Sequence, residues 1–307
     1  MTYSIAWAAG TMSAQLGAWG VTYGDKFVAI GNGGTTGDAW TSTDGVTWTQ
    51  QASMPRNGSN GWVGPAWNGS RYVCVAQNNA PTVAYSSDGM TWTTAANMPT
   101  TDTWIGVVYG AGVFSCVVDN AATTPSLAAA YSTDGITWHS TAMPSAQNWG
   151  VPVFGASVFI APIATSVTSS YAYSTDGITW AAGTIPVADT WVFVASPTRI
   201  LAVGTTNSNC YYSTNGTTWA VATYPGLSVV AGCFGNGVFL LVDNTNYVVS
   251  SDGVSWTPTA ATASTTNSGW VLCAGPGNEF VLVNRNTNVG SASQYGYLAA
   301  SQIVMWI

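Results

Sequence analysis

The heptapeptide Ser42-Thr43-Asp44-Gly45-Val46-Thr47-Trp48 recurs along the chain. Five further copies span Ser86–Trp92, Ser132–Trp138, Ser174–Trp180, Ser213–Trp219 and Ser250–Trp256. The tryptophans that end successive copies lie 44, 46, 42, 39 and 37 residues apart. A repeat of roughly 40 residues is typical of one four-stranded β-propeller blade. The motif therefore predicts an all-β propeller.

Each copy of the motif is expected to build a turn rather than a binding site. An aspartate can accept backbone N–H groups across a turn, and glycine adopts backbone angles that a Cβ would block. The tryptophan can pack between neighbouring blades. The predicted structural turn residues are Asp44, Asp88, Asp134, Asp176, Asn215 and Asp252.

The segments between the copies contain short strands that are apolar on both faces. Tyr72-Val73-Cys74-Val75 and Phe239-Leu240-Leu241-Val242 are examples. Such a strand must be covered on both faces, which the neighbouring blades of a propeller provide. The turns that precede these strands, such as Trp67-Asn68-Gly69, have the composition of hairpin turns.

The number of inner strand pairs predicts seven blades. The pairs begin near Trp19, Trp62, Trp104, Trp149, Trp191, Val229 and Trp270. Only six copies of the motif exist, but Ile5–Met12 aligns with Ile178–Ile185, so the N-terminal strand is expected to complete the last blade. We predict one domain, 1–307, forming a seven-bladed β-propeller of four-stranded antiparallel blades. The blades are placed near 17–48, 61–92, 103–138, 148–180, 190–219, 228–256 and 269–301, with strand 3–9 added to the last.

The apolar tail Ile303–Ile307 is left over by this arrangement. We expect it to be buried against the closing blade or against another chain, because an exposed apolar edge would be prone to association. Because this tail is left over, six-plus-one variants of ring closure stay open.

The motif resembles the Asp box, or BNR repeat, of sialidase-like propellers, which has the pattern Ser-x-Asp-x-Gly-x-Thr-Trp. Here Asp and Gly are adjacent, as in Asp134-Gly135, so the box is one residue shorter. Similar compact repeats occur in phage tail and other virion proteins, which this neutral, tryptophan-rich chain also resembles. In the resembled family the boxes lie on the face opposite the active site.

The resemblance implies a sialidase site that the chain does not supply. Sialidases use three clustered arginines, a tyrosine nucleophile paired with a glutamate, and an aspartate. The arginines of this chain are Arg56, Arg71, Arg199 and Arg285, which are predicted to divide between opposite rims, and the single glutamate is Glu279. We therefore predict that the chain is not an enzyme.

Other chemistries are also poorly supplied. The single histidine, His139, follows the motif tryptophan Trp138 on an expected outer strand, and without a second histidine no histidine-based metal site can be assembled. The cysteines Cys74, Cys116, Cys210, Cys233 and Cys273 are odd in number and form no CxxC pair. We predict no cofactor and no metal.

The composition restricts the class of partner. Charged residues make up 6% of the chain, and the net charge is −7. Nucleic acids and anionic membranes require clustered lysine and arginine, so neither partner is predicted. The chain opens without the basic segment of a secretory signal. We expect a location on a virion surface or outside the cell.

The candidate ligand site is the rim formed by the loops between blades. A polar residue precedes a tryptophan there in most repeats, and an aromatic face beside a polar group suits a sugar ring. The alternative is that these tryptophans pack between blades as core. The candidate residues are Trp19, Trp62, Trp104, Trp149, Trp191, Trp270, Asn60, Asp102, Asn148, Asp189 and Asn267.

Three functions are therefore compared. The first is a non-enzymatic virion or cell-surface module that recognises a host-surface glycan or receptor. The second is a purely structural or decorating propeller that contacts other virion proteins. The third is a glycoside hydrolase whose catalytic residues the sequence does not identify.

Overall fold

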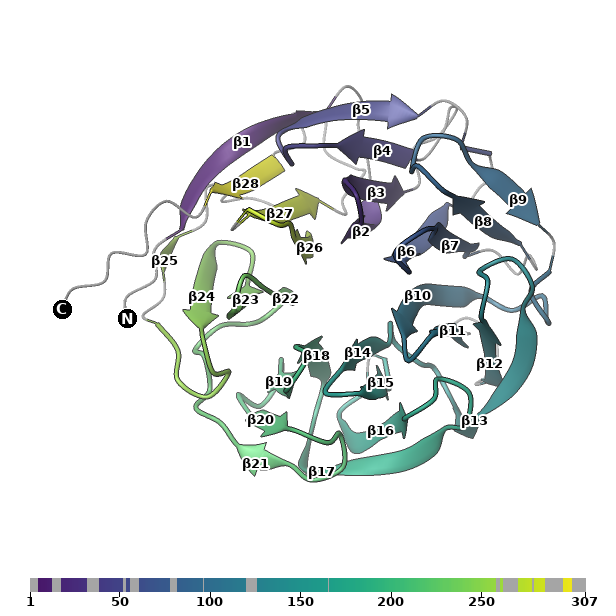
Figure 1. The fold of residues 1–307 in the computed structure, drawn as a ribbon. Coiled ribbons are helices and arrows are strands. Elements are labelled where there is room, and N and C mark those ends of the chain that lie inside the picture. The colour runs from purple at the N-terminus through teal and green to yellow at the C-terminus, as the bar shows by residue number, and fades with distance from the viewer. Residues whose placement is uncertain are drawn as a thin grey trace.

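The described part of the chain forms a ring of β-strands (Figure 1). The computed structural model describes residues 5–12, 18–31, 39–51, 54–55, 61–77, 82–95, 97–119, 126–164, 166–257, 260–261, 270–277, 279–284 and 295–299. All named elements in these ranges are strands. The predicted all-β propeller with four-stranded antiparallel blades is confirmed at this level.

Five blades have four antiparallel strands each. One contains β6 (Trp62–Trp67), β7 (Tyr72–Ala76), β8 (Val83–Ser86) and β9 (Thr93–Ala95). The next contains β10 (Trp104–Gly110), β11 (Val113–Val118), β12 (Ser126–Ser132) and β13 (His139–Gln147). It is followed by β14 (Val153–Gly155), β15 (Val158–Pro162), β16 (Thr168–Ser174) and β17 (Ala181–Asp189). The last two contain β18 (Trp191–Ala195), β19 (Ile200–Gly204), β20 (Cys210–Ser213) and β21 (Ala220–Val221), then β22 (Ala231–Gly235), β23 (Val238–Val242), β24 (Asn246–Ser250) and β25 (Ala260–Ala261).

The remaining strands form one sheet of eight. It contains β1 (Ala6–Met12), β2 (Ala18–Tyr23), β3 (Phe27–Gly31), β4 (Ala39–Ser42), β5 (Thr47–Gln51), β26 (Trp270–Ala274), β27 (Glu279–Asn284) and β28 (Tyr295–Ala299). Their order is β2-β3-β4-β5-β1-β28-β27-β26, and we call this sheet the wide blade. Its two ends, β2 and β26, both lie at the centre of the ring (Figure 1).

The prediction of seven blades is wrong. The described strands form six hydrogen-bonded sheets, so the structure is a six-bladed propeller in which one blade is eight strands wide. The reason lies in the N-terminal strand, which covers Ala6–Met12 rather than 3–9. Its first part pairs antiparallel with β28, and its last two residues pair in parallel with β5, through Thr11–Thr47 and Met12–Trp48. The first and the last described strands, β1 and β28, therefore share one sheet.

The core lies between the blades. The second strand of each blade is buried along almost its whole length, because neighbouring blades cover both of its faces. One core cluster shows the arrangement: Val117 of β11 packs with Phe159 and Ala161 of β15 and with the motif tryptophan Trp180. The apolar composition of these strands follows from this two-sided burial.

A second set of buried side chains precedes the prolines that follow the motif. In two blades these residues belong to the long outer strands β13 and β17. In four blades the residue before the proline is a buried anchor that holds the outer part of the blade to the core. These anchors are Met54, Met98, Met143 and Ile185.

The strand order divides the turns between two faces of the ring. Because each blade is antiparallel, the turns after its first and third strands lie on one face, which we call the Asp-Gly face. The loops after the second strand and those that lead to the next blade lie on the other, which we call the loop face. Within the described residues no helix is long and apolar enough to cross a bilayer.

Candidate functional site

The aspartates of the Asp-Gly face hold their own turns. Asp134 Oδ1 accepts the N–H groups of Ile136 and Thr137, both at 2.8 Å, and the hydroxyl of Ser132 at 2.9 Å. Gly135 N–H in turn donates to Ser132 Oγ at 2.8 Å. The same oxygen has the same role in the other copies, including Asn215, whose Oδ1 accepts from Thr217 and Thr218.

These hydrogen bonds determine the ionisation of the aspartates. Partial burial alone would raise the pKa of Asp134, but the donors from Ile136, Thr137 and Ser132 outweigh it and hold the pKa below its usual value. The pKa values of Asp44, Asp88, Asp176 and Asp252 are lowered in the same way. These carboxylates are therefore ionised turn residues, and they are poor general acids at neutral pH.

Cations on the same face reach from one blade to the next. Lys26, in the turn before β3, donates through Nζ to the backbone carbonyl of Asp88 at 2.9 Å. Arg71, in the corresponding turn before β7, donates to the backbone carbonyl of Asp134. The positive charge of Arg199, before β19, adds to the hydrogen bonds that lower the pKa of Asp252 against the opposing effect of burial. We call the contacts of Lys26 and Arg71 the inter-blade latches.

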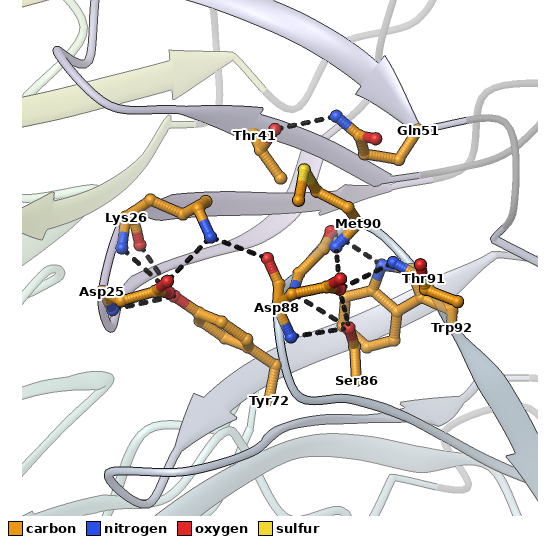
Figure 2. Close-up of polar contacts among 11 residues, drawn as sticks. Asp25, Lys26, Thr41, Gln51, Tyr72, Ser86, Asp88, Met90, Thr91 and Trp92 are labelled. Atoms are coloured by element: carbon orange, nitrogen blue, oxygen red, sulfur yellow. Dashed lines mark hydrogen bonds and ion pairs between the residues drawn. The ribbon is translucent and has the colours of Figure 1, made fainter.

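The first latch includes a buried tyrosine (Figure 2). Tyr72 OH donates to Asp25 Oδ1 at 2.6 Å, and it accepts the backbone N–H groups of Asp25 and Lys26. Lys26 Nζ lies 2.7 Å from Asp25 Oδ2. Burial and the neighbouring Asp25 carboxylate raise the pKa of Tyr72 far above its usual value. Tyr72 is fully buried and neutral, so its hydroxyl does not serve as a nucleophile. The hydrogen bonds of the cluster instead join two blades.

The tryptophans of the predicted ligand rim are mostly core residues. Trp62, Trp104, Trp149 and Trp191 are 0%, 0%, 1% and 6% exposed. Three of their indole N–H groups donate to backbone carbonyls of nearby loops: Trp62 to Pro55, Trp104 to Thr100 and Trp191 to Thr168. Trp19 is partly buried against the same core. The burial of the first four favours the alternative that they pack between blades, since no ring face is free for a sugar.

The polar residues of the rim differ from one another. Asp189 is fully buried, and its carboxylate accepts the N–H groups of Thr190, Thr206 and Asn207 and the side-chain amide of Asn209. Burial opposes its ionisation, but these donors hold its pKa below the usual value. Asp189 therefore ties two loops together. Asp102 accepts the hydroxyl of Thr100.

Asn148 occupies a different position from the one that the sequence comparison assigns. Its backbone carbonyl accepts Ala164 N–H, just as the carbonyls of Thr103 and Thr190 accept the residue that follows the second strand. Asn148 thus corresponds to Thr103 and Thr190, and not to Asp102 and Asp189. Asn60 and Asn267 lie outside the described residues, as does the side chain of Trp270, although that residue begins β26.

The sequence analysis did not identify the exposed apolar side chains of the loop face. Seven large apolar side chains are exposed in the described part of the chain, and Met90 and Val221 lie away from this face. The other five are placed by their strands on the loop face: Leu127, Val151, Val167, Val187 and Val230. The sequence gives no selective signal for them, because a large apolar residue in a loop or near a strand end is common.

The described residues supply few other reactive groups. His139 is exposed on the outer strand β13, beside Tyr131. Burial raises the pKa of the thiols of Cys116, Cys210 and Cys273, which are free. In the described ranges no three His, Cys, Asp or Glu side chains come together as a metal site. The predicted positions of Arg56, Arg285 and the tail Ile303–Ile307 fall outside these ranges.

Comparison with known proteins supports the fold. The sequence matches no known family and no curated protein. A streptogramin B lyase structure superposes with a TM-score of 0.77 at 10% identity, covering 97% of this chain and 98% of that one. YCF48 bound to D1 peptide gives 0.71 at 13%, covering 96% and 95%, and the WD40 propeller domain of Doa1 gives 0.61 at 8%, covering 96% and 98%. At such low identity the likeness shows a shared β-propeller fold, which hosts a lyase and binding proteins alike.

Proposed function

We propose that this chain is a non-enzymatic recognition module whose loop face binds a host-surface glycan or receptor. The observation that supports it is the contrast between the two faces. On the Asp-Gly face the turn aspartates accept hydrogen bonds within their own turns, and Lys26 and Arg71 donate to backbone carbonyls of the next blade. Five of the seven exposed large apolar side chains lie on the loop face. Variable loops on a rigid scaffold are where binding sites concentrate.

A place on a virion or cell surface accords with the repeat and the composition. The compact Asp-box-like motif resembles repeats of phage tail proteins, and its aspartates accept backbone N–H groups within their own turns. Only 6% of residues are charged, so specific contacts are expected to come from short-range packing and hydrogen bonds.

A catalytic function is disfavoured by the state of the described polar groups. Asp189, the buried carboxylate of the loop face, already accepts donors on both oxygens. The single histidine lies on an outer strand. Since an enzyme, a lyase, shares the fold, the third candidate is tested by a control assay for the turnover of glycosides.

The direct test is a glycan array together with binding to intact host cells. We expect the protein to bind at least one glycan class, and soluble oligosaccharide of that class to compete with cell binding. Asp134→Ala, on the opposite face, should bind with the wild-type affinity per folded molecule. Absence of binding to both glycans and cells would favour the second candidate, a structural propeller whose apolar loop face contacts other virion proteins.

A further inference from the structure

The innermost strand of the β14–β17 blade is interrupted on the loop face. β14 has three residues, whereas the other innermost strands have five to seven. Trp149 pairs with Ile163 in an isolated bridge, while Val153 pairs with Ile160, so one extra residue is accommodated between them. Pro152 has no N–H to continue the ladder.

The interruption places a side chain where neighbouring blades have none. Gly64 and Gly106 occupy the corresponding bulges of β6 and β10, both with positive φ. A Cβ on Gly64 would lie 2.2 Å from Gly106 Cα, and one on Gly106 would lie 2.9 Å from Val151. The β6 and β10 strands therefore approach each other closely at this level. The positions Gly64, Gly106 and Val151 form a row from blade to blade, and the row ends at Val151, whose side chain is 50% exposed.

Exposed apolar groups continue from Val151 across the blade. Gly150 N–H donates to Pro162 O, and Ala164 N–H donates to Asn148 O, both at 2.8 Å, so segments 148–151 and 162–164 lie side by side. Val167 follows, 56% exposed. Its neighbour Thr168 pairs with Asp189, which brings the exposed Val187 to the same end of the blade. We call Asn148, Val151, Val167 and Val187 the blade rim.

The blade rim also holds an unpaired acceptor. Asn148 Oδ1 is buried without a hydrogen-bond partner within the described residues, although the residue as a whole is partly exposed. The other buried side-chain atoms in this state are indole N–H groups, of which that of Trp149 belongs to the same segment. An unpaired buried acceptor is costly, so rotation of the Asn148 side chain toward a donor on a ligand is favourable.

We propose that the blade rim binds a neutral oligosaccharide, an inference that rests on the proposed recognition function. A sugar hydroxyl donates to Asn148 Oδ1, and the C–H face of the sugar packs on Val151 and Val167. We expect the ligand to be neutral, because the carboxylate at this end of the blade, Asp189, is buried and both of its oxygens already accept hydrogen bonds from the protein. It therefore offers no free charge to a ligand. A charged sugar would find no opposite charge among these residues.

The test compares variants of the blade rim with matched controls. Wild-type protein is applied to an array of neutral, sialylated and sulfated glycans, and the affinity for the best neutral glycan is measured. Asn148→Ala and Val151→Ser should each weaken binding about tenfold, the worth of one good contact. Thr190→Ala changes the corresponding position of the next blade, and Val221→Ser changes an exposed valine of an outer strand; both should bind as the wild type does.

The outcomes separate this inference from the proposed function. Melting of each variant shows whether it is folded, and Val167→Ser is a further variant if Asn148→Ala does not fold. If all blade-rim variants still bind glycan, or if the wild type prefers acidic glycans, the blade rim is not the site of a neutral oligosaccharide. The proposed recognition function would then still stand. Failure of the wild type to bind any glycan or host cell would overturn both.

Discussion

Lys26 Nζ donates to the backbone carbonyl of Asp88 at 2.9 Å, and so joins the wide blade to the β6–β9 blade (Figure 2). The corresponding turn of the next blade places Arg71 on the carbonyl of Asp134. The Arg199 guanidinium, at the same repeat position, lies over the ring of Tyr212 in its own blade. Two of the five cations of the chain therefore donate hydrogen bonds from one blade to the next. In this weakly charged protein, positive charge stabilises the ring.

The Lys26 latch should contribute measurably to stability. Lys26→Met keeps the aliphatic stem but removes the donor to Asp88 and the partner of Asp25. We expect the free energy of unfolding to fall by about 1 kcal/mol, because one partly buried charged hydrogen bond is lost. Urea unfolding measures this change. A midpoint equal to that of the wild type would show that the latch is energetically neutral.

The Asp-Gly turns should tolerate asparagine better than alanine. Asp134→Ala removes the acceptor for two backbone N–H groups and a hydroxyl, and should cost about 1–2 kcal/mol. Asp134→Asn keeps the oxygen, as Asn215 does in the fifth copy, and should cost less. Thermal unfolding of the two variants gives the comparison. Equal losses would mean that the charge of Asp134 matters and that its geometry does not.

Acid should destabilise the ring through the same aspartates. Hydrogen bonds outweigh burial and hold the pKa values of Asp44, Asp88, Asp134, Asp176 and Asp252 below the value of about 3.9 in the unfolded chain. This contribution to stability is fully present above that pH and is lost as the pH falls through the lower folded values. Unfolding measured from pH 6 to pH 2 should show a decline that begins below about pH 4. The decline should be smaller in Asp134→Asn, and a flat profile would contradict the assignment.

The rim tryptophans should behave as core residues. Trp104→Ala and Trp191→Ala remove side chains that are 0% and 6% exposed, and should each cost about 3–5 kcal/mol. Binding to cells or glycans should then follow the folded fraction of each variant. The measurement is binding normalised to folded protein. If a variant stayed fully folded but lost binding, its tryptophan would be a ligand contact and not a core residue.

The division between predictable and unpredictable features follows the range of the interactions. The Asp-Gly turn forms from residues two or three positions apart, so its spacing in the sequence is enough to identify it. The sequence could not show that Asn148 corresponds to Thr190 and not to Asp189, because this correspondence depends on the hydrogen bond from Ala164 N–H to the backbone carbonyl of Asn148. The burial of Trp104 likewise depends on Cys116 and Ala130 of its own blade and on Val75 of the neighbouring one.

The sequence by itself determined the β-propeller, the blade length and the turn residues, because these depend on period and on short-range hydrogen bonds. Tertiary structure decided how the ring closes, since Thr11 and Met12 reach Thr47 and Trp48 only after β1 has paired with a strand from the other end of the chain. It also decided which face exposes apolar groups. A valine is core or surface according to whether a neighbouring blade covers it, and only the assembled ring places Val151 at the open end of the row that Gly64 and Gly106 close.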